Sequence, residues 1–198
     1  MIQGIEILRE DDPRCSELET RGFTLVGESW GARLSLNADD DLSIYTEALN
    51  SVVGTGISIQ ELDIDFANAL LDLELITNPD YPYTPATFHE VPTIEGIRAL
   101  WRPGNRIFGA ISEVVLIGAI CTTGKEERTE IDFASLLRAY RGQGIGKALL
   151  AAGILAWESL GVRVFTTGGA AQNSASLGTV RSLGFAVEEK WRSYQPPL

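Results

Sequence analysis

The spacing of apolar residues marks out a series of strands and helices. Apolar stretches at residues 107–111, 114–122 and 127–137 follow one another with brief polar connections, which predicts three strands joined as a meander. A shorter strand is expected at residues 57–62, and a helical pattern follows at residues 65–75. The strands predicted in the middle of the chain are therefore expected to form a β-sheet.

The segment between that helix and the meander shows neither the helical nor the strand periodicity of apolar residues. Residues 78–85 contain three prolines, which remove main-chain donors and restrict their neighbours, so a loop is expected. Thr93 precedes a short helical pattern at residues 94–101 and suits its N-cap.

The last third alternates helices with strands. A helical stripe at residues 144–160 precedes Gly161, which suits the C′ position. A strand at residues 162–166, a helix at 173–183 and one or two strands at 185–194 follow. A meander followed by helix, strand, helix and strand predicts an α/β (α+β) fold with a mixed sheet covered on both faces.

A segment near the N-terminus resembles the end of the chain. Residues 21–30 and 183–191 share a Gly-Phe pair, a mixed apolar and acidic stretch and a tryptophan, apart from one inserted residue. We predict that residues 23–30 form a strand that pairs with the main sheet or a partner chain and buries Phe23 and Trp30. A loosely attached leader is the alternative.

Composition and charge narrow the function classes. The 198 residues are 44% hydrophobic and 22% charged, which is ordinary for a globular protein. A net charge of −11 repels phosphate backbones, so no nucleic-acid partner is expected; the acidity favours a cationic amine substrate, or serves solubility alone. No stretch approaches the ~20 apolar residues of a membrane helix. With two cysteines and no secretory pattern, a cytoplasmic protein without a membrane partner is expected.

The feature with the clearest chemistry is the glycine-rich sequence RGQGIGKAL at residues 141–149, between a strand and the start of a helix. Glycines let a ligand approach the main chain closely, and the free N–H groups and positive dipole end of the helix attract anions such as pyrophosphate. A dinucleotide fingerprint would need glycine at Lys147, and a P-loop would need glycine at Arg141 and Ser or Thr at Ala148. A turn without a ligand is the remaining alternative.

This sequence resembles the phosphate loop of the GNAT superfamily (GCN5-related N-acetyltransferases). The family pattern Arg/Gln-x-x-Gly-x-Gly/Ala is supplied here by Arg141, Gly144 and Gly146. In that family a strand, an asparagine that opens a helix and a terminal Leu-Gly-Phe follow in order, and Asn173 and the tripeptide at 183–185 stand in those places.

The resemblance covers about residues 57 to 195 and implies a GNAT domain at residues 56–198. That fold has a mixed, mostly antiparallel central sheet with helices on both faces and a splayed strand pair that holds acyl-CoA. Residues 1–55 are expected to be an N-terminal extension that contains a strand and packs on the main sheet or on a partner chain, as in a homodimer.

The resemblance implies acetyl-CoA as the co-substrate and no metal. The strand before the phosphate loop would pair its backbone with the pantetheine arm, the loop would hold the pyrophosphate, and Asn173 would bond the pantetheine or the departing sulfur. The residues expected to bind the cofactor are Ala134, Ser135, Leu136, Arg141, Gly142, Gln143, Gly144, Ile145, Gly146, Lys147 and Asn173.

The implied chemistry is direct transfer of the acetyl group to a primary amine. A protonated amine has no lone pair, and the pKa of a lysine-like amine is ~10.4, so a base is expected. Glu130, eleven residues before Arg141, is the candidate catalytic base and has the strand parity of Ala134 and Leu136. Asp132, expected on the same face, and water are the alternatives.

The family's general acid has no counterpart here. Many members carry a tyrosine seven residues after the asparagine, where this chain has Val180. Ser176, one turn after Asn173, is the candidate catalytic substitute; alternatively the thiolate, with an ordinary pKa of ~8.5, leaves unaided. A nucleophilic Cys121 activated by His89 is another enzymatic alternative.

The acceptor is expected to be an amine of a small molecule or a peptide. Tyr81, Tyr83 and His89, in and after the proline-rich loop, are the candidate substrate contacts, because a rigid loop with aromatic edges suits the wall of a pocket. The competing functional class is a module of the same fold that binds acyl-CoA or a protein partner without catalysis, since the tyrosine acid is missing.

Overall fold

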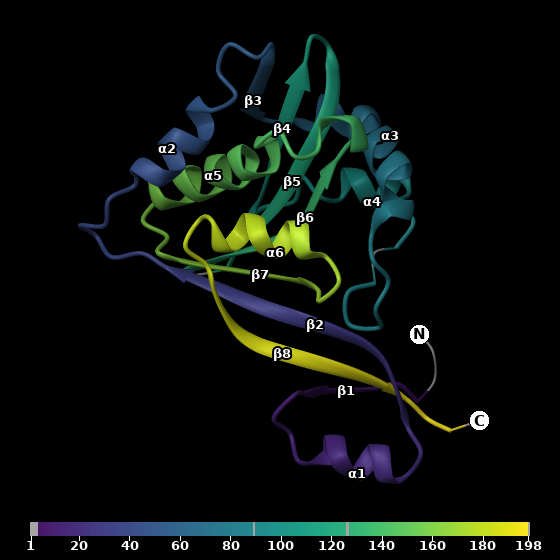
Figure 1. Ribbon diagram of the computed structural model, residues 1–198. Coiled ribbons are helices and arrows are strands. Elements are labelled where there is room, and N and C mark those ends of the chain that lie inside the picture. The colour runs from purple at the N-terminus through teal and green to yellow at the C-terminus, as the bar shows by residue number, and fades with distance from the viewer. Residues whose placement is uncertain (1–3, 89, 126, 198) are drawn as a thin grey trace.

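Figure 1 shows the computed structural model of the chain, which describes residues 4–88, 90–125 and 127–197. The strands are β1 (Glu6–Arg9), β2 (Thr24–Ser35), β3 (Ile57–Glu61), β4 (Asn105–Ser112), β5 (Val115–Lys125), β6 (Arg128–Leu136), β7 (Val164–Ala170) and β8 (Ala186–Gln195). They form one eight-stranded sheet in the order β1-β8-β2-β7-β6-β5-β4-β3. β6 and β7 run parallel, and the other neighbouring pairs are antiparallel. The predicted mixed, mostly antiparallel sheet is confirmed.

The α-helices cover both faces of this sheet. They are α1 (Arg14–Thr20), α2 (Ser43–Asn50), α3 (Ala67–Thr77), α4 (Ile94–Arg98), α5 (Ile145–Glu158) and α6 (Ser174–Arg181). α2 and α5 pack over one hydrophobic cluster of the sheet, and α3 and α4 pack over another on the opposite face (Figure 1). Within the described residues, no helix has the length and apolar character needed to cross a membrane.

Two predicted helix ends are confirmed in atomic detail. The Thr93 side chain caps α4 by accepting a hydrogen bond from Gly96 N at 3.1 Å. After α5, Gly161 has a φ of +91°, and its N–H donates to Glu158 O at 2.8 Å. The next N–H, of Val162, donates to the carbonyl five residues earlier at 3.1 Å, which completes a Schellman motif. The strand expected at 162–166 begins slightly later and extends to Ala170 as β7.

The strand predicted at residues 23–30 is confirmed as β2, and it lies inside the sheet. β2 pairs antiparallel with both β7 and β8. Trp30 is buried at 5% exposure in the core under α5, as predicted. The predicted burial of Phe23 is only partial, and this side chain packs beside the buried Tyr194. A loosely attached leader is therefore wrong for this segment, while the division of the chain at residue 55 stays a prediction.

The sequence similarity between the two ends corresponds to a repeated strand-helix-strand unit. β1, α1 and β2 repeat the order of β7, α6 and β8, and each helix is followed by a glycine of positive φ, Gly22 at +83° and Gly184 at +90°. The N–H of Phe23 and that of Phe185 each donate to the carbonyl five residues earlier, at 3.0 and 3.2 Å. Exchanging the two units turns the order β1-β8-β2-β7 into β7-β2-β8-β1, which is the same order read from the other end. We infer a pseudo-twofold relation about the β2–β8 pair.

Candidate active site

A cleft of about 1390 Å³ opens where β6 and β7 separate. The parallel register runs from Arg128 opposite Val164 to Glu130 opposite Thr166. Beyond this point β6 continues to Leu136 and β7 to Ala170, and residues of both strands line the cleft. Two parallel strands that part in this way expose main-chain hydrogen-bonding groups to whatever enters between them. A splayed strand pair of the predicted kind is present.

The glycine-rich segment forms the turn from β6 into α5 at this cleft. Gly142 and Gly144 have φ angles of +75° and +80°, in the left-handed region that favours glycine. The N–H of Ala148 donates to Gly144 O at 3.0 Å, whereas the N–H groups of residues 145–147, in the first turn, have no acceptor inside the helix. Six residues of the turn line the cleft: Arg141, Gly142, Gly144, Ile145, Gly146 and Lys147. The turn is thus suited to bind an anion.

The side chains of Arg141 and Gln143 have structural partners in this turn. The Arg141 guanidinium donates to Leu136 O at 3.0 Å and to Asp80 Oδ2 at 2.8 Å, and Arg138 donates to the other oxygen of Asp80 at 3.0 Å. The hydrogen bond from Arg141 is the main cause that lowers the pKa of Asp80. Gln143 donates to Ala139 O at 3.0 Å and does not line the cleft. The arginine therefore ties the turn to the end of β6 and to the segment after α3.

A β-bulge at Asp132 changes which face the residues of β6 occupy. Cys121 of β5 pairs with Phe133, but the next residue, Thr122, pairs with Ile131, so Asp132 is the extra residue. Ile131 accordingly packs in the core under α5, and Phe133 packs on the opposite face with α3. The regular alternation predicted along this strand therefore breaks at Asp132.

The prediction that Glu130 lies on the same face of the strand as Ala134 and Leu136 is therefore wrong. Glu130 pairs with Thr123, which lies on the face opposite Thr122, and Thr122 accepts a hydrogen bond from Trp157 of α5 at 2.8 Å. Glu130 thus faces the α3 side, whereas Ala134 pairs with Ile120 of the core under α5. The bulge supplies the physical reason, because one inserted residue reverses the alternation.

Both candidate base residues still line the cleft. Glu130 stands at the last paired position before β6 and β7 separate. Asp132 accepts hydrogen bonds from Thr123 Oγ1 at 2.5 Å and from Cys121 Sγ at 3.8 Å, which hold it against β5. Glu130 is therefore the carboxylate at the separation point itself.

The start of α6 forms another wall of the cleft. Asn173 is its N-cap, and its Oδ1 accepts a hydrogen bond from Ser176 N at 3.1 Å. The side-chain oxygen is thus used by the helix, while the NH₂ group is a donor. Asn173, Ser176 and Val180 all line the cleft, and Val180 is buried.

The proline-rich loop contributes Tyr81 to the cleft. The Tyr81 hydroxyl bonds to Ala134 O at 2.9 Å and to Ser135 Oγ at 2.7 Å, and Ser135 in turn donates to the buried Glu74. Burial is the main cause that raises the Tyr81 pKa, so the hydroxyl remains protonated. Tyr83 is 53% exposed and does not line the cleft, but it packs edge-on against Phe88, which does. His89 lies outside the described residues.

A model of the acetyltransferase (GNAT) family matches residues 69–185. This chain belongs to the GNAT family. Members are generally N-acetyltransferases, and the match contains the splayed strands, the phosphate loop and α6. No curated protein matches the sequence.

Several solved structures share the GNAT fold with this chain at low identity. A GCN5-related N-acetyltransferase from Sphaerobacter thermophilus has a TM-score of 0.74 at 15% identity, covering 96% of this chain and 58% of that one. A tandem GNAT protein from the clavulanic acid biosynthesis pathway has a TM-score of 0.66 at 18% identity, covering 96% and 62%. The ribosomal-protein-S18-alanine N-acetyltransferase from Escherichia coli has a TM-score of 0.56 at 17% identity, covering 70% and 91%. The chain thus spans less than two thirds of the first and the tandem structure.

A cysteine nucleophile does not suit this GNAT site. Cys121 is fully buried among the residues under α3, and it does not line the cleft. Burial, followed by the nearby Asp132 carboxylate, raises the pKa of Cys121 to about 12. A buried thiol that stays protonated at neutral pH is a poor nucleophile.

Sequence reasoning missed the part of the GNAT cleft that the two ends of the chain build. Beyond β7, the cleft is lined by residues of β1, β2 and β8: Ile7, Ser29, Trp30, Gly31, Glu189 and Trp191. The similarity between residues 21–30 and 183–191 was the available signal for this wall. It indicated strands, but it did not indicate that they border the same cleft.

Proposed function

We propose that the chain is an N-acetyltransferase that moves the acetyl group of acetyl-CoA directly to a primary amine of a small molecule or peptide. The observation that carries the proposal is the cleft between β6 and β7, with the glycine turn of α5 on its lining and Glu130 at the separation point. Family membership supports acetyl transfer, and the donor and acceptor are the proposed parts.

The residues present fit the phosphates and the pantetheine arm of such a donor. The free N–H groups at the start of α5 suit a pyrophosphate, and Lys147 adds a positive charge beside them. The backbone of residues 134–136 lies past Glu130, the last residue of β6 that pairs with β7, and suits the amides of a pantetheine arm. The NH₂ group of Asn173 suits a carbonyl oxygen or the thioester sulfur. Arg141 positions the turn through Asp80.

In the proposed reaction Glu130 takes the proton of the ammonium group, directly or through water. The freed nitrogen attacks the thioester carbonyl and forms an N–C bond, and the C–S bond breaks. The nitrogen loses its second proton to solvent, and the thiolate receives a proton. Ser176 is the proposed donor of that proton, because it lines the cleft in the first turn of α6 where the expected tyrosine is replaced by Val180.

Tyr81, held on β6 by its two hydrogen bonds, is the proposed wall between donor and acceptor. Tyr83 and His89 stay predictions as substrate contacts. The unpaired, buried Cys15 and Cys121 support the proposal of a reducing, cytoplasmic location.

A second candidate function is binding of acyl-CoA without transfer, which the valine in place of the tyrosine acid favours. Incubation with acetyl-CoA and a panel of primary amines separates the two. Transfer releases one thiol per acetylated amine, so thiol titration and product mass should agree, with an amine-free reaction as the control for hydrolysis. Calorimetric binding of acetyl-CoA without acetylation of any amine would establish the binding module instead.

Gly144→Ala is expected to weaken acetyl-CoA binding by at least about tenfold. A Cβ at a φ of +80° strains the turn and displaces the N–H groups that bind the pyrophosphate. Gly161→Ala is the matched control, because Gly161 also has positive φ and open space around it, yet lies outside the cleft. Calorimetry and thermal melting should show similar losses of stability but different affinities. Equal affinities for acetyl-CoA would refute the phosphate-loop assignment.

Ser176→Ala is expected to lower kcat by about tenfold, less than the usual 10²–10⁴ for general acid catalysis, because a thiolate is already a good leaving group. The KM for acetyl-CoA should change little. Ser159→Ala, at the far end of α5, is the control for loss of a helix-terminal serine. An unchanged kcat in Ser176→Ala would mean that the thiolate leaves unaided.

A further inference from the structure

We infer that Glu189 recognises a second positive charge on the acceptor and that Arg9 competes for this carboxylate. The inference rests on the proposed acetyl transfer and names the class of acceptor: an extended molecule with a cationic group remote from the reacting amine. It comes from the part of the cleft that continues beyond the separated strands, over β7, β2 and β8.

Glu189 and Glu130 lie on the same face of the sheet. Glu189 pairs with Gly31, Gly31 pairs with Gly168, and Thr166, two residues before Gly168, pairs with Glu130. Paired residues share a face, as do residues two apart on one strand. An acceptor lying along this face can therefore reach both carboxylates.

The separation of the two carboxylates sets the size of the acceptor. β8, β2, β7 and β6 are successive neighbours, so three steps of ~4.8 Å separate the outer two. Two residues along β7 add about 7 Å in the perpendicular direction, which gives about 16 Å between the two positions. A short monoamine cannot span this distance, whereas an extended oligoamine can.

The floor between these positions has little side-chain bulk. Gly31 and Gly168 line this stretch of the cleft, and Thr166 follows beside Glu130. A Cβ added at Gly31 would lie 3.0 Å from Glu189 Oε2, so the carboxylate itself lies over the glycine. An unbranched chain therefore has room to lie along the strands from Glu189 toward Glu130.

Glu189 is oriented and partly accessible. Trp191 Nε1 donates a hydrogen bond to its Oε2 at 3.2 Å, and the side chain of Glu189 remains 44% exposed. The second carboxylate oxygen, Oε1, faces Arg9. The indole thus fixes one oxygen, while the other is the position for a cationic partner.

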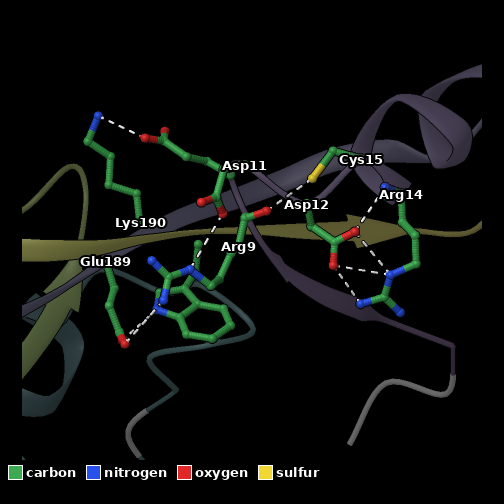
Figure 2. Close-up of polar contacts among 9 residues, drawn as sticks. Arg9, Asp11, Asp12, Arg14, Cys15, Glu189 and Lys190 are labelled. Carbon is green, nitrogen blue, oxygen red and sulfur yellow. Dashed lines mark hydrogen bonds and ion pairs between the residues drawn. The ribbon is translucent and has the colours of Figure 1, made fainter.

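Arg9 occupies that position loosely (Figure 2). Its Nη1 lies 3.6 Å from Glu189 Oε1, and its Nε lies 3.5 Å from Asp11, which offers an alternative partner. Both contacts are longer than a charge-assisted hydrogen bond and are partly exposed to solvent, so each contributes little. A cationic group of the acceptor can replace Arg9 at Glu189 while Arg9 stays with Asp11. Arg9 comes from β1, so the N-terminal unit takes part in selecting the acceptor.

The test compares α,ω-diamines of increasing chain length with the ω-amino alcohols of the same lengths. Each pair differs in the remote charge and shares the reacting amine. We expect kcat/KM for diamines long enough to span about 16 Å to exceed that of the matched amino alcohol by about fivefold, the upper end for a partly exposed ion pair. Short diamines should show no such preference.

The two variants should change the preference for diamines in opposite directions. Glu189→Gln should reduce the diamine preference to about one, and Arg9→Gln should raise it about twofold, because the competing cation is gone. Arg14→Gln is the matched control, since Arg14 binds Asp12 at 2.7 Å and should leave the preference unchanged (Figure 2). If the Arg9–Glu189 pair had only a structural role, both substitutions would change the preference for diamines in the same direction.

The outcomes are distinguishable from failure of the proposed function. Acetylation of the amino alcohols without any preference for long diamines overturns the inference and leaves the proposed transfer intact. The same holds if Arg9→Gln and Glu189→Gln shift the preference alike. Absence of acetyl transfer to every amine overturns the proposed function itself.

Discussion

Replacing Glu130 with glutamine is expected to lower kcat by about 10²- to 10⁴-fold at neutral pH. Glu130 lines the cleft at the last paired position before β6 and β7 separate, where the acceptor amine must meet the thioester. Glutamine keeps the shape and the hydrogen-bonding capacity but cannot accept the ammonium proton. The loss should therefore appear in kcat, with the KM for acetyl-CoA nearly unchanged.

The pH dependence of the rate of this variant tests whether Glu130 acts as the base. An acceptor amine with a pKa of ~10.4 is almost entirely protonated at pH 7, and its free fraction rises about tenfold per pH unit below that pKa. The rate of Glu130→Gln should climb accordingly toward alkaline pH and recover part of the loss. Asp132→Asn is the matched control, because Asp132 also lines the cleft but is held against Thr123. A near-normal profile of Glu130→Gln would move the role of base to Asp132 or to water.

Deleting residues 1–34 is expected to abolish cooperative folding. β8 pairs with β1 and β2, and this deletion removes β1 and nearly all of β2. It also removes the buried Trp30 and Leu34 from the core under α5. At ~25 cal/mol per Å² of apolar surface, the loss of these two side chains alone costs several kcal/mol, a large share of the about 5–15 kcal/mol that stabilises a typical domain.

A shorter deletion provides the comparison. Removing residues 1–22 eliminates β1 and α1 but keeps β2 between β7 and β8, so the protein should still unfold cooperatively at a lower melting temperature. The expected loss comes from the cluster around Tyr194, which packs against Leu8, Cys15 and Leu18. Circular dichroism melting of the three proteins measures both effects. If the 1–34 deletion melts like the full chain, β2 is not needed for the fold.

The properties that the sequence alone determined are those set by neighbouring residues. The glycine turn, the cap at Thr93 and the helix end at Gly161 depend on local backbone conformation and on hydrogen bonds within a few residues. The alternation of apolar residues likewise predicted the meander and the helices, because one buried face leaves a periodic pattern. Family membership followed from the same local motifs, and the match at residues 69–185 confirmed it.

What only the tertiary structure decided depends on pairing between distant segments. The bulge at Asp132 arises from the register between β5 and β6, which residue types do not specify, and it placed Glu130 on the face opposite to the predicted one. The position of β2 between β7 and β8 likewise depends on which strand edges meet. Arg9 and Glu189, 180 residues apart in the chain, came together only because β1 pairs with β8. The sequence thus predicted the elements and the phosphate loop, whereas strand order and register determined which side chains share the cleft.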